Sequence, residues 1–166
     1  MLRRLGDTRH NILVAQCTLG MAYQKTGRLD EALRIHLDNY SGRLKLHGKE
    51  HVETIRAADN CAVSLLDLQR FKEAISMLRK WLPVAGRVLG KSDALMYCMK
   101  YKYATALCEA DGATLSDLRE AVTTLEETEP TARRVLGGSH PTTEAIEESL
   151  RDARAALRAR ETPSPG

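Results

Sequence analysis

The sequence predicts an all-α protein built as an α-solenoid, a right-handed superhelix of antiparallel helix pairs with about seven helices. Three observations predict this fold: a residue pattern with a period of 42, apolar residues at helical spacing within each period, and a low content of aromatic residues. Aromatic residues make up only 4% of the chain, and Ala and Leu supply most of the apolar 43%. This composition suits close helix packing and does not suit a β-sandwich or a β-barrel.

Four glycines mark the period. Each follows a leucine by one or two positions, and together they are Gly6, Gly48, Gly90 and Gly137. The first two steps are 42 residues long and the third is 47. A fixed period in this range is typical of repeat proteins in which each unit is a small helical motif.

A second series of residues supports the same period. Segment 27–32 recurs 42 positions later as 69–74, and again, in weaker form, 47 positions later at 118–121. Both series therefore place an insertion of five residues in the third period, and we expect it between Cys108 and Ser116.

Each period divides into two helices. Gly27 interrupts the first period, at a place where a C-cap glycine would satisfy the last helical carbonyls. We expect helices at about 8–26, 29–47, 50–68, 71–89, 92–110, 115–136 and 140–160. These would form one domain, residues 1–161, made of repeats 8–48, 50–90 and 92–137 and a capping helix 140–160, followed by a disordered tail, 162–166.

Two prolines and one arginine refine this map. Pro141 fits the first turn of the capping helix, whereas Pro130 falls inside a helix and should kink or break it near Glu129. Arg151 stands where earlier repeats have a small residue, as expected of a last helix with one polar side. The apolar stripe of this last helix comprises Ile146, Leu150, Ala153 and Leu157.

The first period resembles the tetratricopeptide repeat. Leu19-Gly20-x2-Tyr23, followed by Ala32, matches part of the signature of that family. Small residues recur at the two signature positions where helices approach closely, as Gly20, Ala62 and Ala104 and as Ala32, Ala74 and Ala121. The resemblance implies stacked helix pairs that bind a partner protein in a concave groove.

The period of 42 is longer than the usual ~34 of this family and resembles the kinesin-light-chain-like type. That type carries a Leu-Gly-x-x-His-Pro segment between repeats, which segment 136–141 matches fully and segment 48–51 matches in part. Asp93 stands at the position of the histidine in the remaining copy, and segment 59–62 resembles the Asn-Asn-Leu-Ala segment of the type. The resemblance implies a kinesin-light-chain-like adaptor or scaffold.

Charge and cysteine content limit the classes of function. A formal net charge of +3, evenly spread, is too small for a nucleic-acid-binding surface. The four cysteines form no close pair, which indicates reduced thiols in a cytoplasmic protein. No segment has the length of a signal peptide core or of a membrane span.

No pattern in the sequence points to catalysis. His47 and His51 have a spacing that zinc sites use, but Gly48 should end a helix between them, so we expect no metal. The sequence contains no phosphate-binding glycine loop and no nucleophile elbow. We therefore expect no cofactor and no enzymatic activity.

The resemblance implies that the first helices of the repeats line the groove. The residues that would face it are Val14, Cys17, Thr18, Met21, Gln24, Lys25, Arg56, Asp59, Asn60, Val63, Asp67, Cys98, Tyr101, Lys102, Thr105 and Glu109. The principal candidates for peptide binding are Lys25, Arg56, Asn60, Tyr101 and Lys102. Lys and Arg can pair with acidic groups, and Asn can bond a peptide backbone, so we expect an extended peptide or a helix, acidic in character.

Two alternatives remain open at this stage. Asn60 and Lys102 resemble in place two residues of the clamp by which some tetratricopeptide domains hold a chaperone's C-terminal carboxylate, but Cys17 and Met21 replace the other two. The chain could also be a structural, self-associating segment of a longer solenoid. That hypothesis predicts an exposed apolar face at the N-terminal edge, at Leu2, Leu5, Ile12 and Leu13.

Overall fold

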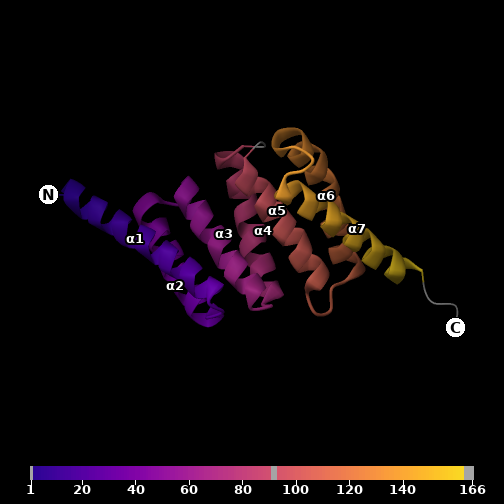
Figure 1. The fold of residues 1–166 in the computed structure, drawn as a ribbon, viewed down its shortest axis with the longest axis horizontal. Coiled ribbons are helices and arrows are strands. Elements are labelled where there is room, and N and C mark those ends of the chain that lie inside the picture. The colour runs from indigo at the N-terminus through magenta and orange to yellow at the C-terminus, as the bar shows by residue number, and fades with distance from the viewer. Residues whose placement is uncertain (1, 91–92, 163–166) are drawn as a thin grey trace. The chain divides into compact units, whose positions relative to one another are not determined.

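The computed structural model describes residues 2–90 and 93–162, with side chains from Thr8 onward, and every regular element there is an α-helix (Figure 1). The helices are α1 (Leu2–Lys25), α2 (Leu29–His47), α3 (Val52–Asp67), α4 (Phe71–Val88), α5 (Ala94–Glu109), α6 (Leu115–Leu136) and α7 (Pro141–Glu161). The predicted fold class is confirmed. Apart from the start of α1, each helix begins and ends within two residues of the expected position.

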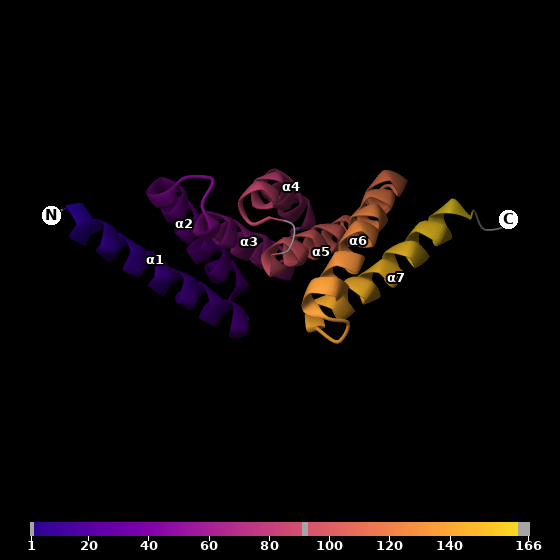
Figure 2. The same ribbon diagram turned by 90° about the horizontal axis from the view of Figure 1, so that it is seen from above.

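The helices group into two compact units, Met1–Val88 and Leu89–Gly166. In the first unit each helix from α1 to α4 packs against the next one, and the successive helices lie side by side in both views (Figures 1 and 2). In the second unit α6 packs against both α5 and α7, and α7 also contacts α5. The arrangement of all seven predicted helices in one domain stays a prediction.

The six small residues of the repeat pattern are all buried. Gly20 shows why the position must be small: a Cβ atom there would lie 2.3 Å from Nε2 of His36 on α2. Ala62 and Ala104 occupy the equivalent positions of α3 and α5, and neither exposes any surface. A small side chain at these points lets the two helices of a pair approach closely.

His36 joins three helices of the first unit. Its ring fills the space above Gly20 of α1, and its Nδ1 lies 2.8 Å from Oγ of Ser64 on α3. Next to it, Leu33, Leu65 and Ala74 form an apolar cluster among α2, α3 and α4. The packing of α2 against both neighbours thus depends on one buried imidazole and a small apolar core.

The inter-repeat His and Asp residues are helix N-caps. His51, Asp93 and His140 precede α3, α5 and α7, and each accepts a hydrogen bond from the backbone N–H two residues later, at 3.2, 2.8 and 3.1 Å. An N-cap needs a side-chain acceptor on extended backbone, which Asp and neutral His both provide. Pro141 follows His140 in the first turn of α7, as predicted.

The glycine series has one exception. Gly48, Gly90 and Gly137 have positive φ angles of 82°, 79° and 96° and follow or closely follow the ends of α2, α4 and α6. The prediction that Gly6 also precedes a helix was wrong, because α1 already begins at Leu2 and Gly6 lies within it. Arg9, which occupies the position of the capping His51, is inside α1 and caps nothing.

The five-residue insertion lies where the sequence predicted it. The loop between α5 and α6, residues 110–114, has two residues more than loop 68–70 between α3 and α4. The other three extend the start of α6, whose N-cap Thr114 forms a reciprocal capping box with Asp117. The insertion therefore lengthens a helix as well as a loop.

Pro130 does not break its helix. α6 continues through it to Leu136, so of the predicted kink or break near Glu129 the break does not occur. Leu125 and Ala132, on either side of Pro130, are fully buried, while Pro130 itself is exposed. Packing therefore holds both halves of the helix, and the carbonyl that loses its N–H partner lies on the side open to water. Pro83 also lies inside a continuous helix, α4, and is also exposed.

The last helix buries its predicted stripe. Ile146, Leu150 and Ala153 are buried, Leu157 is half-buried, and Arg151 is exposed. Thr162 follows the end of α7, and the rest of the predicted tail, residues 163–166, lies outside the described residues.

Gly20→Ala should destabilise the protein by about 1–3 kcal/mol, because the overpacked Cβ outweighs the ~1 kcal/mol gain in helix propensity. Urea unfolding followed by circular dichroism measures the change. Gly138→Ala is the matched control, because its Cβ would meet only Arg133 Nη1 at 3.5 Å, an ordinary contact. Equal stability of Gly20→Ala and the wild type would contradict the role of this close approach.

Candidate functional site

The predicted site residues fall on two faces. Lys25 lies at the end of α1, and Arg56 and Asn60 lie on α3, so the first unit holds three of the five. Tyr101 and Lys102 lie on α5 in the second unit. The predicted continuity of one groove over all five residues stays a prediction.

Two side-chain hydrogen bonds join α1 to α3. Asn60 donates through Nδ2 to Sγ of Cys17 at 3.4 Å, and Gln24 donates through Nε2 to Oδ2 of Asp67 at 2.8 Å. Both bonds link residues 43 positions apart, so α1 and α3 run in the same direction with a fixed register. The sequence placed all four residues on the groove but gave no signal for their pairing, which depends on that register.

Two cations stand at opposite ends of this helix pair. Lys25 lies at one end, because it follows Gln24, whose side chain bonds Asp67. Arg56 lies at the other end, eleven residues or about 16 Å before Asp67 along α3. Both side chains are exposed, and within the described residues neither forms an ion pair. We name the surface between them the α1–α3 face.

The middle of the α1–α3 face is partly apolar. Val14 and Met21 on α1 are 45% and 44% exposed, and Val63 on α3 is half-buried. Asn60 is half-buried among them and has its Nδ2 occupied by Cys17. Within the described residues, no hydrogen bond reaches its Oδ1. Between the two cations the face thus offers apolar contacts and one amide acceptor, and the exposed carboxylate of Asp67 lies beside Lys25 at one end.

The face on α5 has a different character. Tyr101 and Lys102 are both half-buried, and Lys102 already interacts with another group of the protein. Sγ of Cys98 on α5 lies 3.9 Å from Oγ1 of Thr142 on α7, so this contact links α5 to α7 within the second unit. The half-burial of Tyr101 agrees with a side chain that packs on its own unit.

His47 and His51 stack instead of converging on a metal. Their ring centroids are 4.2 Å apart with an interplanar angle of 13°, and His10 of α1 meets the His47 ring edge-on at 6.2 Å. Nδ1 of His51 is occupied as the N-cap acceptor of α3. Among the described residues, no group of three or more His, Cys, Asp or Glu side chains is placed to hold a metal ion.

Charge around His47 opposes its protonation. Burial lowers the pKa of His47, and His51, the buried Arg43 and His10 lower it further, while Glu53 alone acts in the opposite direction. Glu53 is already paired with Arg43 at 3.2 Å. Burial also lowers the pKa of His36, whose Nε2 has no hydrogen-bond partner among the described residues.

Comparison with known proteins identifies the repeat. The chain matches the tetratricopeptide repeat family over residues 3–85, half of its length. A comparison with curated protein sequences gave no match. In the described part of the chain, no helix combines the length and apolar character needed to cross a membrane.

Several solved structures share the fold. One is a point variant of nearly identical TPR-like repeats from a Podosopora anserina protein described as a kinesin light chain. Its TM-score is 0.73 at 21% identity, and the match covers 90% of this chain and 68% of that chain. The form without that substitution gives 0.71 with the same identity and coverage. BtubC (BKLC) from P. vanneervenii gives 0.52 at 13% identity, over 95% of this chain and 68% of that one. The predicted resemblance to kinesin-light-chain-like repeats is thereby confirmed for the fold.

Stability should fall as the pH is lowered from 7.5 to 5.5. The unfolded chain takes up protons at His36 and His47 near the ordinary pKa of 6.5, whereas the folded chain resists protonation until lower pH. Acid therefore favours the unfolded state below about 6.5, and urea midpoints across this range measure the loss. The slope should be shallower in His47→Gln. An unchanged slope in both His47→Gln and His36→Gln would contradict this origin.

Cys61 should be the least reactive thiol of the folded protein. It exposes no surface, and burial, aided by the charge of Asp59, raises its pKa from 9.0 to about 12. Alkylation by iodoacetamide at pH 8 should therefore be slower than in the urea-unfolded chain by about a hundredfold or more. Peptide mass spectrometry measures the rate of alkylation, and half-buried Cys17 serves as the internal comparison. Equal rates in the folded and unfolded chains would contradict the burial.

Proposed function

The chain belongs to the tetratricopeptide repeat family, and on that premise we propose that it is a non-catalytic scaffold that binds an acidic segment of another protein. The observation that carries the proposal is the pair of exposed, unpaired cations, Lys25 and Arg56, at the two ends of the α1–α3 face. Repeat proteins of this kind typically serve protein interaction, and the first helices of their repeats supply the binding surface.

The dimensions of the α1–α3 face suit an extended peptide. A span of about 16 Å between the two cations corresponds to about five residues of extended chain, at roughly 3.3 Å per residue. Acidic side chains at both ends of such a segment would meet Lys25 and Arg56, while apolar side chains between them would cover Val14 and Met21. Oδ1 of Asn60 would accept a backbone N–H of the peptide.

The finer features of the proposal follow the same chemistry. We assign the chain a cytoplasmic, kinesin-light-chain-like adaptor role, which agrees with four free cysteines. Tyr101 and Lys102 on α5 would provide a separate contact surface. The chaperone-clamp alternative is disfavoured, because Cys17 and Met21 replace two polar residues of that clamp and Cys17 occupies the amide donor of Asn60.

Reversal of the two cations tests the proposal. A fluorescein-labelled peptide, Glu-Leu-Ala-Leu-Glu, serves as the probe, and fluorescence polarisation measures its binding. Lys25→Glu/Arg56→Glu should weaken binding by about tenfold or more, because two attractive pairs of roughly 0.5–1 kcal/mol each become repulsive. Wild-type binding should also weaken with added salt, since both cations are exposed.

The matched control is Arg34→Glu, which reverses an exposed cation on α2, away from the α1–α3 face. It should leave binding within about twofold of the wild type, and circular dichroism confirms that all variants fold. Equal weakening by Arg34→Glu and by the double reversal would show general charge attraction and would overturn the proposed face.

A further inference from the structure

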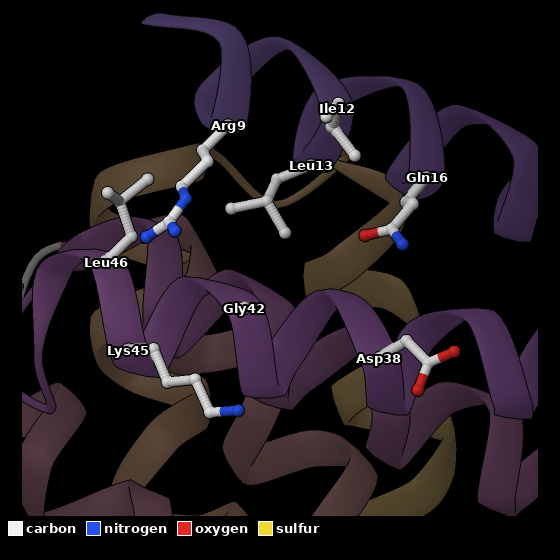
Figure 3. Close-up of a pocket in the computed structure, with 8 residues that line it drawn as sticks. All are labelled: Arg9, Ile12, Leu13, Gln16, Asp38, Gly42, Lys45 and Leu46. Atoms are coloured by element: carbon white, nitrogen blue, oxygen red, sulfur yellow. The ribbon is translucent and has the colours of Figure 1, made fainter. Parts of the chain in front are cut away.

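A second surface of the first unit has no role in the proposed peptide binding. It is a pocket of about 390 Å3 between α1 and α2, on a side of α1 other than the α1–α3 face (Figure 3). Ile12 and Leu46 line it, and Leu13 lies at its base above Gly42, where a Cβ atom would be 2.4 Å from Cδ2 of Leu13. We name this surface the edge pocket.

The internal repeat allows this surface of α1 to be compared with the equivalent surface of α3, which another helix covers. Ile12 and Leu19 of α1 are 53% and 42% exposed, whereas their counterparts 42 positions later, Thr54 and Cys61, expose nothing. On α3, Thr54 donates to the carbonyls of Arg43 and Gly48, so the end of α2 covers the position that corresponds to Ile12. Of the four residues that the sequence predicted to form an exposed apolar face, Ile12 is exposed, Leu13 is buried, and the side chains of Leu2 and Leu5 lie outside the described residues.

A helix like α2 would find few of its polar contacts here. On α3, Thr54 donates to the carbonyl of Gly48 at 2.8 Å, Glu53 pairs with Arg43, and Ser64 bonds His36. The counterparts on α1 are Ile12, Asn11 and Ala22, in that order. Ile12 and Ala22 have no polar side-chain atom, and the uncharged Asn11 cannot form an ion pair, so the edge pocket differs in chemistry from the surface that α2 covers.

Charge runs along the edge pocket from one end to the other. Arg9 and Lys45 lie at one end, and Asp38 lies at the other, seven residues from Lys45 along α2, or about 10 Å (Figure 3). Within the described residues, none of the three forms an ion pair. The surface is therefore basic at one end, apolar in the middle and acidic at the other end.

A surface with this order of charges is complementary to itself. A two-fold axis through its middle would place the basic end of one copy over the acidic end of the other. We propose that the edge pocket is an isologous dimer interface with a second copy of this chain. Ile12 of each copy enters the pocket of the other, and Arg9 of each copy pairs with Asp38 of the other. The α1–α3 face stays open in this dimer.

Charge exchange between two variants gives a decisive test. Sedimentation equilibrium of the wild type should show a monomer–dimer equilibrium. Arg9→Glu alone and Asp38→Arg alone should each weaken the dimer by about tenfold or more, because each places like charges together twice. An equimolar mixture of these two variants should dimerise again, since both pairs then hold opposite charges. Ile12→Asp should abolish the dimer without rescue by either variant.

The controls separate this proposal from the peptide-binding one. Arg34→Glu, on α2 outside the edge pocket, should dimerise like the wild type. The dimer-deficient variants should still bind the acidic peptide, so each proposal can fail without the other. A strictly monomeric wild type at about 1 mM, or no dimer in the mixture of the two variants, would overturn the interface. A monomer that instead binds an amphipathic helical peptide at Ile12 would show a partner helix as the occupant and would equally overturn it.

Discussion

The first unit depends on the close approach of α1 and α2 at Gly20. The missing side chain leaves room for the ring of His36, which in turn reaches Ser64 on α3. This small residue, together with Gly42 opposite Leu13, lets α2 lie close to α1, and one imidazole relates that pair to the next helix. The register between α1 and α3, including the bond between Cys17 and Asn60, follows from this packing. Alanine fills the equivalent position in α3 and α5, where no imidazole must be accommodated.

Helix α1 carries three surfaces with different chemistry, because 3.6 residues per turn distribute its side chains around the axis. Gly20 and Leu13 face the core, Val14 and Met21 belong to the α1–α3 face, and Ile12 borders the edge pocket. In α3, the counterpart of Ile12 is buried by a neighbouring helix. Repetition of one helix pair therefore separates the α1–α3 face from the surface at Ile12, which no described helix of the first unit buries.

Local signals in the sequence were accurate wherever one residue satisfies a backbone requirement. His51, Asp93 and His140 stand at one position of the inter-repeat segment and all three cap a helix, which explains why Asp can replace the histidine there. Local signals failed where packing competes with them. Pro130 was expected to kink or break α6, but the helix is continuous, with buried residues on both sides of the proline, and Gly6 is tolerated inside α1.

The sequence by itself determined the period, the order of the helices, their bounds apart from the start of α1, and the small residues between paired helices. These features depend on neighbours within a few turns, or on a spacing that repeats, and both can be read along a single chain. Only the tertiary structure decided which side chains meet. Asn60 bonds Cys17 and Gln24 bonds Asp67 because the register of α1 against α3 brings together residues 43 positions apart. Packing likewise leaves Lys25 and Arg56 exposed at opposite ends of one face, and neither forms an ion pair among the described residues.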